Sequence, residues 1–561
     1  MIYRQSVYTL ATSLCFAVVT MMVATAQTVE NTRFPGGQIT VNSSQDGPIT
    51  ADDQLTLREA IAITNGTLTR AALSETEQQQ ITGADSSVIA FDLPANDTTI
   101  KLQALLPVLS QPGLVIDGTT QPGYDATKSA TAEILVAIPL VEITSANDAE
   151  IFRGFTIAAD NVTIRGLSLY GFTSKHRATE STPPADIFIG HELPTPDMGQ
   201  QPIPSGEFSV YNENKPPEGI IIEHNWLGIP IDNRMPQNPS AFGVSVFNSA
   251  GATLQHNRIS YHDGSGVITG AQAENLKIVE NLIVNNGLAG IPDAIRLEGR
   301  IDNGLIADNL ICGNNGSAIF LFKPQGAVNI NNNNIHFNGQ RLQRAAIYLM
   351  GNDHQVNNNF ITNQAGPGIV VTAYSQGGYP QSQRNVIESN RMENLEALSI
   401  DLNTRRNPSV QSFQRGDGPN PLRDSHNRRR DTGNSAINPP QFDSPEFFLL
   451  DGEVIIQGKA DVGSTVQLYL TRGKTGEYGP LTRPLITVEV AEDGTFVLVS
   501  SDLQPGDVLS GIATDPSYGT SEPALNTTVV ALGETSVTRP NRMGPATIEN
   551  IQCAPLPAPR S

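Results

Sequence analysis

The chain has 561 residues, of which 39% are hydrophobic and only 6% aromatic, and it contains 49 glycines and 38 prolines. This composition is typical of many short strands joined by turns and is poorly suited to large helical cores. The formal net charge of -21 disfavours nucleic acids and anionic lipids as partners, because both repel an acidic protein.

Residues 1–26 have the features of a secretory signal peptide. Arg4 precedes an apolar stretch at 10–23, and the sequence ATA at 24–26 provides a small-x-small cleavage site. The apolar stretch is short for a membrane span and nothing later resembles one, although an uncleaved anchor is the alternative. We therefore expect a monomer that is secreted or held at the cell surface, with no membrane span once the signal is removed.

Residues 27–87 are predicted to form an N-terminal capping region with one short helix. The best helical segment is QLTLREAIAI at 54–63, which Asp52 or Asp53 would cap. An amphipathic helix here would cover the open end of a stack of strands, since bare strand edges invite aggregation. Its apolar side would contain Leu55, Leu57 and Ile61, and its outer side Arg58 and Glu59.

Seven short segments between 220 and 393 align so that each has an asparagine at the same position. The separations are 32, 24, 28, 24, 26 and 31 residues, and the flanking residues alternate between apolar and polar. Such a repeat predicts a β-solenoid whose coils stack at about 4.8 Å. Asparagine tolerates left-handed turn geometry, and aligned amides would form a hydrogen-bonded ladder, which we prefer over a ligand-binding row. The ladder residues are Asn225, Asn257, Asn281, Asn309, Asn333, Asn359 and Asn390.

Each coil contains a second strand with alternating apolar residues, for example AIFL at 318–321 and AIYL at 346–349. The alternation predicts that Ile319 and Leu321 point inward while the residue between them points outward. A Pro-rich insert at 172–218 interrupts the repeat, and loops of this length often carry function. The outward row would contain Ser245, Ile268, Arg296, Phe320, Tyr348, Val370 and Asp401.

After the repeat, residues 405–440 form a polar linker and a different pattern of strands begins. Six or seven short apolar segments separated by turns occupy 441–534, which predicts a small β-sandwich. Residues 535–561 are Pro-rich and are expected to form a loose tail. Cys312 fits a buried free thiol within the stack, and a disulfide between Cys312 and Cys553 is the alternative.

Two segments resemble a known group of proteins. TLREAI at 56–61 is similar to the leucine-arginine-glutamate-alanine motif of secreted bacterial parallel β-helix proteins of the pectate-lyase-like superfamily, and LVIDGTTQPGY at 114–124 also resembles that group. The group usually has Cys or Ser before the leucine, where this chain has Thr56. Residues 491–522 resemble bacterial immunoglobulin-like modules.

These resemblances imply an all-β chain. The implied architecture is a right-handed parallel β-helix at 88–404, followed by a small immunoglobulin-like β-sandwich at 441–534. The resemblance to the β-helix group covers about 38–440 and says little of activity, because that group is defined mainly by its architecture.

A concentration of titratable residues between 262 and 298 is the candidate catalytic site. Asp263 and Asp293 precede equivalent strands on consecutive coils, which would place their carboxyl groups roughly 5–10 Å apart. Two carboxyl groups at such a distance can serve as acid and base, or acid and nucleophile, in glycoside hydrolysis, while an arginine would neutralise a uronate. Asp before Gly is also an ordinary turn pair, so a structural role stays open. The candidates are His262, Asp263, Asp293, Arg296 and Glu298.

Phe320 and Tyr348 are candidate substrate-binding residues, with Lys323 as a nearby cation. Aromatic rings stack on sugar rings, although an insert or the C-terminal domain would remove these two from solvent if it covered them. We expect no cofactor and find no metal signature, but calcium is possible near the linker aspartates. Those aspartates are Asp417, Asp424 and Asp431, and the neighbouring Arg428, Arg429 and Arg430 argue against calcium.

The sequence therefore supports two functions. We prefer an exported structural protein that contacts a polysaccharide or a cell-surface glycan, because the scaffold is clear and no catalytic signature matches. The alternative is a polysaccharide lyase, glycoside hydrolase or epimerase that acts on an acidic glycan in a groove of the β-helix.

Overall fold

The structure is a computed structural model of the chain, and it describes most residues between 37 and 532. The predicted signal peptide, the Pro-rich tail, Asp424 and much of the predicted insert lie outside the described residues. The described ranges are 37–83, 86–129, 134–146, 149–174, 182–193, 215–341, 343–376, 379–404, 414–423, 425–426 and 431–532. Within these ranges, no helix is long and apolar enough to cross a membrane.

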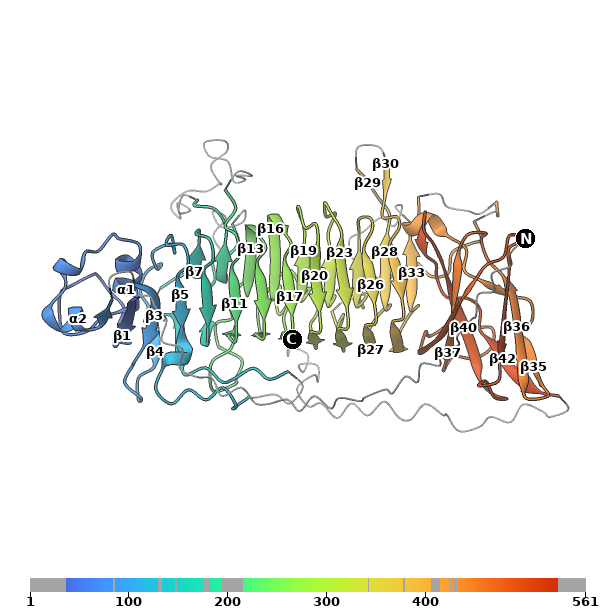
Figure 1. Cartoon of the computed structure of the whole chain (residues 1–561), viewed down its shortest axis with the longest axis horizontal. Coiled ribbons are helices and arrows are strands. Elements are labelled where there is room, and N and C mark those ends of the chain that lie inside the picture. The colour runs from blue at the N-terminus through green and yellow to red at the C-terminus, as the bar shows by residue number, and fades with distance from the viewer. Residues whose placement is uncertain are drawn as a thin grey trace, which may run out of the picture. The chain divides into compact units, whose positions relative to one another are not determined.

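The part of the chain before residue 404 consists of stacked coils, whose strands form three long sheets, named A, B and C here (Figure 1). Sheet A contains, in spatial order, β2 (Ile81–Thr82), β1 (Gly37–Val41), β3 (Ser86–Phe91), β5 (Val115–Asp117), β8 (Thr163–Arg165), β11 (Ile221–Glu223), β14 (Thr253–Gln255), β17 (Lys277–Val279), β20 (Gly304–Ala307), β23 (Val328–Asn331), β26 (Gln355–Asn357) and β31 (Val386–Glu388). Sheet B contains β4 (Thr99–Leu102), β6 (Val141–Ser145), β9 (Leu167–Tyr170), β12 (Trp226–Leu227), β15 (Arg258–Ser260), β18 (Leu282–Val284), β21 (Leu310–Cys312), β24 (Asn334–His336), β27 (Phe360–Gln364) and β32 (Arg391–Leu395). Sheet C contains β7 (Arg153–Ile157), β10 (Ala185–Ile189), β13 (Val244–Ala250), β16 (Val267–Glu274), β19 (Ile295–Leu297), β22 (Ile319–Leu321), β25 (Ile347–Leu349), β28 (Ile369–Thr372) and β33 (Ile400–Asn403).

Each full coil contributes one strand to A, then one to B and one to C, as β20, β21 and β22 show. The inward residues of these three strands, Ile306, Ile311 and Ile319, are buried in one core that runs through the stack. A single coil would leave such residues in water, so burial requires a neighbour above and below. Because strands of successive coils pair in parallel, the predicted all-β fold with a parallel β-helix is confirmed.

The predicted register of the second strands is also observed. Arg296 pairs with Phe320, Phe320 with Tyr348, and Tyr348 with Val370 along sheet C. The row continues to Ser245 at one end and Asp401 at the other. Alternation of apolar residues was sufficient to fix this register, because a slip by one residue would turn the isoleucines to the outside.

The predicted insert at 172–218 is not wholly outside the repeat. Residues 185–189 form β10, which pairs in parallel with β7 on one side and β13 on the other. Its inward residues Ile187 and Ile189 join the common core. The sequence analysis missed this strand because the prolines around it disguise a short ADIFI segment that lacks a neighbouring asparagine line.

Helix α1 (Leu57–Thr64) contacts β1 and β3, and its apolar face joins the core of the coils. Thr56 is its N-cap: the Thr56 hydroxyl accepts the Glu59 backbone N–H, and the Glu59 carboxylate accepts the Thr56 backbone N–H at 2.9 Å. The prediction of an aspartate cap is therefore wrong, and Asp52 instead accepts the N–H of Gln54 at 2.8 Å. Serine, threonine and aspartate all cap helices well, so composition alone did not choose among them.

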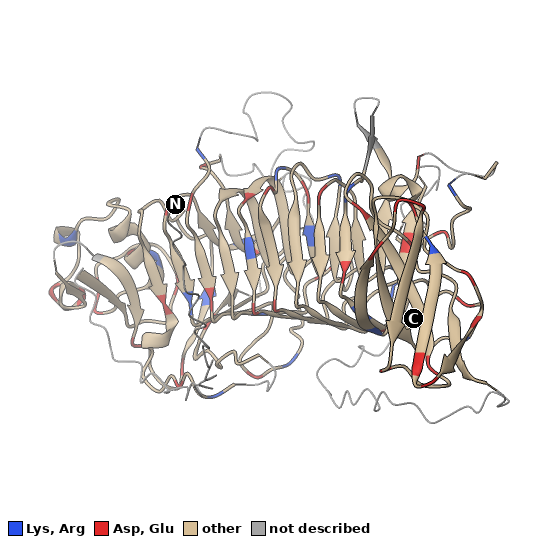
Figure 2. Ribbon diagram, turned by 45° about the vertical axis from the view of Figure 1, so that its right-hand side comes forward, with Lys and Arg blue, Asp and Glu red and all other residues tan. Residues whose placement is uncertain are grey.

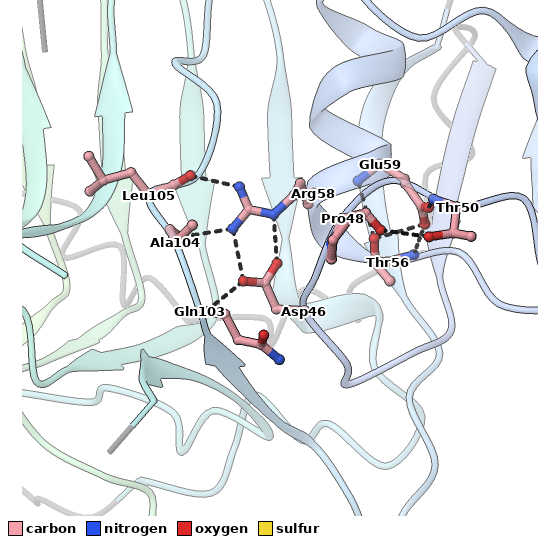
Figure 3. Close-up of polar contacts among 9 residues, drawn as sticks. All are labelled: Asp46, Pro48, Thr50, Thr56, Arg58, Glu59, Gln103, Ala104 and Leu105. Atoms are coloured by element: carbon pink, nitrogen blue, oxygen red, sulfur yellow. Dashed lines mark hydrogen bonds and ion pairs between the residues drawn. The ribbon is translucent and has the colours of Figure 1, made fainter. Parts of the chain in front are cut away.

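Arg58 does not face solvent as expected but fastens α1 to the rest of the fold (Figure 3). Its Nε and Nη2 atoms each lie 2.8 Å from a carboxylate oxygen of the buried Asp46. Its Nη1 and Nη2 atoms also donate to the carbonyls of Leu105 and Ala104, at 2.7 and 2.8 Å. The guanidinium thus joins the helix to the segment that follows β4.

The seven ladder asparagines lie at the turns between sheets A and B, and all are buried. The backbone N–H and Nδ2 of Asn309 donate to Oδ1 of Asn333 on the next coil, at 3.1 and 3.0 Å. Nδ2 also donates to the Ile278 carbonyl of the preceding coil at 2.8 Å. The same arrangement links every neighbouring pair from Asn225 to Asn390.

The left-handed residue at these turns is the one before each asparagine, not the asparagine itself. Its φ lies between 50° and 57° at all seven positions. Such φ values are costly for residues other than glycine, so they persist only where surrounding bonds hold the chain. The ladder supplies those bonds, and it tolerates varied residues before the asparagine. These residues are His224, His256, Glu280, Asp308, Asn332, Asn358 and Ser389.

The chain beyond 440 folds around a core of its own, which includes Val454, Leu468 and Phe496. It has more strands than predicted, because two-residue strands show no alternation in the sequence. The strands are β34 (Gln441–Phe442), β35 (Glu446–Leu450), β36 (Glu453–Lys459), β37 (Thr465–Thr471), β38 (Arg483–Glu489), β39 (Thr495–Ser500), β40 (Val508–Asp515), β41 (Gly519–Thr520) and β42 (Thr527–Ala531). The remaining short elements are η1 (Arg70–Ala72), α2 (Glu75–Gln79), η2 (Gly118–Thr120), η4 (Gly433–Ala436) and the hairpin of β29 (Tyr374–Gln376) and β30 (Tyr379–Gln381).

This C-terminal domain is bonded to the last coil. Glu522 Oε1 accepts the backbone N–H of Leu402 at 3.0 Å, and Oε2 accepts that of Asn420 at 2.7 Å. Gln467 Oε1 accepts the backbone N–H of Ser389, the residue before the last asparagine of the ladder, at 2.8 Å, and the hydroxyl of Tyr469 donates to the same oxygen at 2.6 Å. Tyr469 and Leu481 also belong to the core of the coils, so the domain covers apolar residues that the last coil would otherwise leave open.

Cys312, in β21, is disulfide-bonded, so the expectation of a free thiol is wrong. Its two possible partners within the chain, Cys15 and Cys553, both lie outside the described residues. Cys312 follows Ile311, which points into the core, and this alternation directs its sulfur to the outer side of sheet B. There Cys312 is buried in a small cluster with Leu282, Val284 and Leu310.

Candidate functional site

The predicted cluster around 262–298 does not form one open site. His262 is completely buried, with Nε2 2.8 Å from Asp186 Oδ2 and Nδ1 2.8 Å from Asn286 Oδ1. Ser240 donates to the second oxygen of Asp186, and burial raises the pKa of that carboxyl group. Both nitrogens of His262 are therefore engaged inside the stack and out of reach of a glycan.

Asp293 is also buried, and its contacts are structural. Oδ1 accepts the backbone N–H of Ser317 at 2.9 Å and the Arg344 guanidinium at 3.1 Å. Burial is the main influence on this carboxyl group and raises its pKa. Asp263 lies at a half-buried turn, where its carbonyl accepts the N–H groups of Ala289 and Gly290.

Arg296 and Glu298 are half-buried members of the predicted cluster. Arg296 Nη2 lies 3.2 Å from Glu298 Oε2, and its guanidinium lies over the rings of Phe320 and Phe322 at 4.9 and 4.8 Å. Figure 2 shows positions of both charge signs scattered over the coils without a continuous stretch of one sign. Of the five candidates, His262 and Asp293 are closed to solvent, whereas Asp263, Arg296 and Glu298 are half-buried, and the charges of Arg296 and Glu298 offset each other.

Phe320 and Tyr348 lie side by side as the register predicts, with ring centroids 5.1 Å apart. Both are buried, however, in a small cluster with Ala345, Met350 and Tyr374. Neither ring face is accessible to a sugar, so the structure corrects the expectation that they bind one. Lys323 is exposed beside Phe322, with Nζ 5.3 Å from that ring centroid.

The sequence analysis missed a second asparagine column at the turns between sheets B and C. Asn286 donates from its backbone and from Nδ2 to Asn314 Oδ1, at 2.9 and 3.0 Å, and Asn314 does the same to Asn338. His262 occupies the first position of this column and donates its backbone N–H to Asn286 at 3.2 Å. The repeated NNG, GNN and FNG segments carried this signal, and they explain why His262 is structural.

A hollow of about 450 Å³ opens at the turns that lead from sheet C back to sheet A. Residues of four successive connections between sheets C and A line the hollow, so it could not be predicted from any single segment of the sequence. A cavity of this size matches the roughly 300–1,000 Å³ typical of small-molecule sites. The lining residues are Asp302, Pro324, Gln325, Gly326, Ala327, Gly351, Asn352, Asp353 and Tyr374.

Two glycines of this hollow have backbone conformations that other residues rarely adopt. Gly326 has φ 98°, and a Cβ there would lie 2.5 Å from Asp302 Cα. Gly351 has φ 113°, and a Cβ there would lie 2.6 Å from His354 Nε2. The hollow exists because these turns approach so closely without side chains.

Hydrogen bonds to neighbouring residues fix the polar side chains that line the hollow. Asp302 Oδ1 accepts the N–H of Ala327 at 3.0 Å, and both Asp353 oxygens bond Arg384, at 2.7 and 2.8 Å. Asn352 Oδ1 accepts two backbone N–H groups of the next coil at 2.9 Å. The result is a rigid rim of hydrogen-bond acceptors beside one tyrosine.

In the described part of the chain, no group of three or more His, Cys, Asp or Glu residues is arranged to hold a metal ion. Asp417, one of the aspartates considered for calcium, accepts the N–H of Thr404 at 3.4 Å, and Asp424 lies outside the described residues.

Comparison with protein-family models and with curated proteins finds no match. Among solved structures, the surface adhesin PfbA of Streptococcus pneumoniae is 11% identical with a TM-score of 0.39, covering 66% of this chain and 93% of that one. The enzymatically active domain of tailspike protein 2 of bacteriophage CBA120 is 8% identical with a TM-score of 0.33, covering 79% and 72%. The A-module of a mannuronan C-5 epimerase of Azotobacter vinelandii is 14% identical with a TM-score of 0.28, covering 56% and 88%. These values are too low to support an argument about function, and the fold assignment depends on the sheets themselves.

Proposed function

We propose that this chain is an exported β-helix protein that contacts a carbohydrate, and that the hollow lined by Asp302, Asp353 and Tyr374 is the contact site. The observation that carries the proposal is this hollow of about 450 Å³, whose rim is made of fixed hydrogen-bond acceptors. Sugar hydroxyls donate to carboxylates and amides, and the buried Tyr374 contributes only to the wall of the hollow. Arg384 offsets the charge of Asp353, and the remaining carboxylate of Asp302 favours a neutral sugar over an acidic one.

Export is supported by two independent features. The first 26 residues have the charge and apolar pattern of a signal peptide. Cys312 is disulfide-bonded, and structural disulfides are found mainly in oxidising compartments outside the cytosol. We infer the extracellular space or the cell surface as the site of action.

The test is binding of the purified chain to an array of neutral and acidic polysaccharides. Asp302→Asn keeps the oxygen that accepts from Ala327 but removes the charge, and Ala327→Phe fills the hollow. Asp302→Asn should weaken binding at least tenfold, since one lost charge-assisted hydrogen bond is worth about 1.5–3 kcal/mol. Ala327→Phe should weaken binding at least tenfold as well, because its ring occupies the space of the ligand. Asp232→Asn is the matched control, because Asp232 is an exposed turn aspartate outside the hollow. Unchanged binding in both site variants would refute the assignment of this hollow.

The enzymatic alternative is separated by product analysis of the same mixtures. A lyase or hydrolase releases unsaturated products or reducing ends, whereas a binding protein returns the polysaccharide intact. With His262 and Asp293 enclosed in structural bonds, we expect no product. Product formation that Asp293→Asn abolishes, with the fold retained, would instead favour the enzyme.

A further inference from the structure

A second, smaller hollow lies at the end of sheet C, where β7 is the terminal strand and Leu109 pairs with its Ile157. Its volume is about 60 Å³. A water molecule accounts for about 30 Å³ of liquid, so this space admits a group of a few heavy atoms but not a sugar ring. The lining residues are Leu105, Leu106, Val108, Phe152, Arg153, Thr156, Phe188, His191, Glu192 and Leu193.

Arg153 is the unusual member of this hollow. Its side chain is enclosed, at 7% exposure, with the guanidinium carbon 3.7 Å from the Phe188 ring centroid and 5.3 Å from that of Phe152. Nη2 donates to the Thr182 carbonyl at 3.3 Å, and Nε has no hydrogen-bond partner. A buried guanidinium normally has a carboxylate partner, because removing a charge from water is expensive.

No anion within the described residues compensates this charge. Burial alone lowers the pKa of Arg153 to about 9, with no contribution from a charged neighbour. Glu192 lines the same hollow, but it is exposed to solvent and makes no ion pair with Arg153. The rings of Phe152 and Phe188 offer a cation–π contact, which is worth about 2 kcal/mol when desolvated and so offsets only part of the cost.

A second donor lies in the same hollow. His191 is buried, and its Nδ1 lies 2.9 Å from the Nδ2 amide of Asn248. An amide nitrogen can only donate, so Nδ1 accepts and the ring proton of neutral His191 is on Nε2. Burial lowers the pKa of His191, which keeps the ring neutral and the Nε2–H a hydrogen-bond donor.

We propose that this hollow is an oxyanion-binding site, in which Arg153 and His191 receive a carboxylate or sulfate group carried by a sugar. The Nε–H of Arg153, which has no partner in the free protein, would complete a two-point contact with a planar oxyanion. That a glycan carries the anion depends on the proposed function, whereas the pocket for the anion does not. The site differs from the larger hollow in charge and in the coils that form it.

The experiment is calorimetric titration of the full chain, at constant ionic strength, with four probes. Glucuronate presents a sugar carboxylate, its methyl ester is the uncharged match, glucose 6-sulfate presents a sulfate, and acetate is a free anion. We expect glucuronate or glucose 6-sulfate to bind and the ester to bind at least tenfold more weakly. Arg153→Gln should weaken anion binding at least tenfold, while Arg234→Gln, an exposed arginine far along the chain, should have no effect.

Thermal unfolding with and without anions separates an effect on anion binding from an effect on the stability of a variant. Without a ligand, Arg153→Met should melt at the same or a higher temperature than the natural protein, because an uncompensated buried charge is removed. The anions should raise the melting temperature of the natural protein but not that of the variant. Glu192→Gln should tighten anion binding, since it removes a like charge from the rim.

Several results would overturn the proposal. Equal binding of glucuronate and its ester, or unchanged anion binding in Arg153→Gln, would exclude an oxyanion site. A lower melting temperature of Arg153→Met, with no effect of anions on the natural protein, would make Arg153 a structural residue. Binding of acetate alone would exclude a sugar ligand here. Loss of neutral-glycan binding in Ala327→Phe concerns only the larger hollow, so the two proposals fail separately.

Discussion

At the scale of single residues, the ladder asparagines illustrate how one amide satisfies two coils. Asn309 accepts from Asn281, donates to Asn333, and donates to the carbonyl of Ile278. These asparagines are buried, so their groups depend on one another for hydrogen bonds. The residue is thus more costly to remove than its small size suggests, because several neighbours lose a bond together.

We therefore expect Asn309→Ala to lower the free energy of unfolding by about 2–4 kcal/mol, since each buried polar group left without a partner costs about 1–3 kcal/mol. Urea unfolding followed by circular dichroism measures the change. Asn329→Ala, at an exposed position of β23 whose side chain makes none of the ladder bonds, is the control and should change stability by less than about 0.5 kcal/mol. Equal effects of the two substitutions would contradict a stabilising ladder.

At the scale of elements, helix α1 shows why a short amphipathic segment is stable at the end of the coils. Its eight residues are too few for an independent helix in water. The capping box of Thr56 and Glu59 satisfies its first N–H groups, and Arg58 ties it to Asp46 and to two carbonyls. Tertiary bonds, more than helix propensity, fix this element.

Arg58→Ala should destabilise the N-terminal region by about 3–5 kcal/mol, because it leaves Asp46 as a buried carboxylate without its partner. Hydrogen exchange of the α1 amides is the measurement, and their protection should fall before that of the central coils. Arg58→Lys should be intermediate, since lysine cannot bond both oxygens and two carbonyls. Arg483→Ala, at an exposed position of β38, provides the baseline. Protection unchanged by Arg58→Ala would show that the apolar face alone holds the helix.

Elements that repeat could be predicted from the sequence, and contacts between distant segments could not. The asparagine line and the alternating isoleucines determined the coil register, because both patterns have a fixed period along the chain. Phe320 and Tyr348 were placed side by side correctly, yet their burial depends on Ala345, Met350 and Tyr374, which follow no period. The hollow at Gly326 and Gly351 depends in the same way on close approach of four turns. The sequence does not single out Arg153, because neither the burial of an arginine nor the lack of an ion-pair partner leaves a pattern in the sequence.

At the scale of the whole molecule, the junction between the coils and the C-terminal domain contains carboxyl groups that titrate near neutrality. Burial raises the pKa of Asp401 to about 7, and burial together with the charge of Asp401 raises that of Glu522 to about 8. Asp401 accepts the N–H groups of Asp417 and Gly418, at 3.1 and 3.0 Å. The folded state therefore retains protons that the unfolded chain releases near pH 4.

Because the folded protein binds more protons than the unfolded one between about pH 4 and pH 8, the free energy of unfolding should fall as pH rises through this range. We expect a lower melting temperature at pH 8.5 than at pH 5.5, measured by scanning calorimetry. Glu522→Gln should flatten the dependence, and Glu453→Gln, on an exposed strand position, should leave it unchanged. Stability that rises with pH over the same range would contradict the assignment.

The asparagine ladder has a direction, since the backbone N–H of each asparagine from Asn225 to Asn359 donates to the asparagine of the next coil toward the C-terminal end. A coil at the end of such a column has backbone groups without partners, and a further coil could bond to them in the same way. Gln467 and Glu522 of the C-terminal domain accept backbone N–H groups of the last coil, those of Ser389 and Leu402, at 2.8 and 3.0 Å. The C-terminal domain thus occupies hydrogen-bonding groups of the last coil that would otherwise be available to a further coil. Without it, the final coil would present the same bonds to another copy of the protein, and growth into filaments would compete with folding.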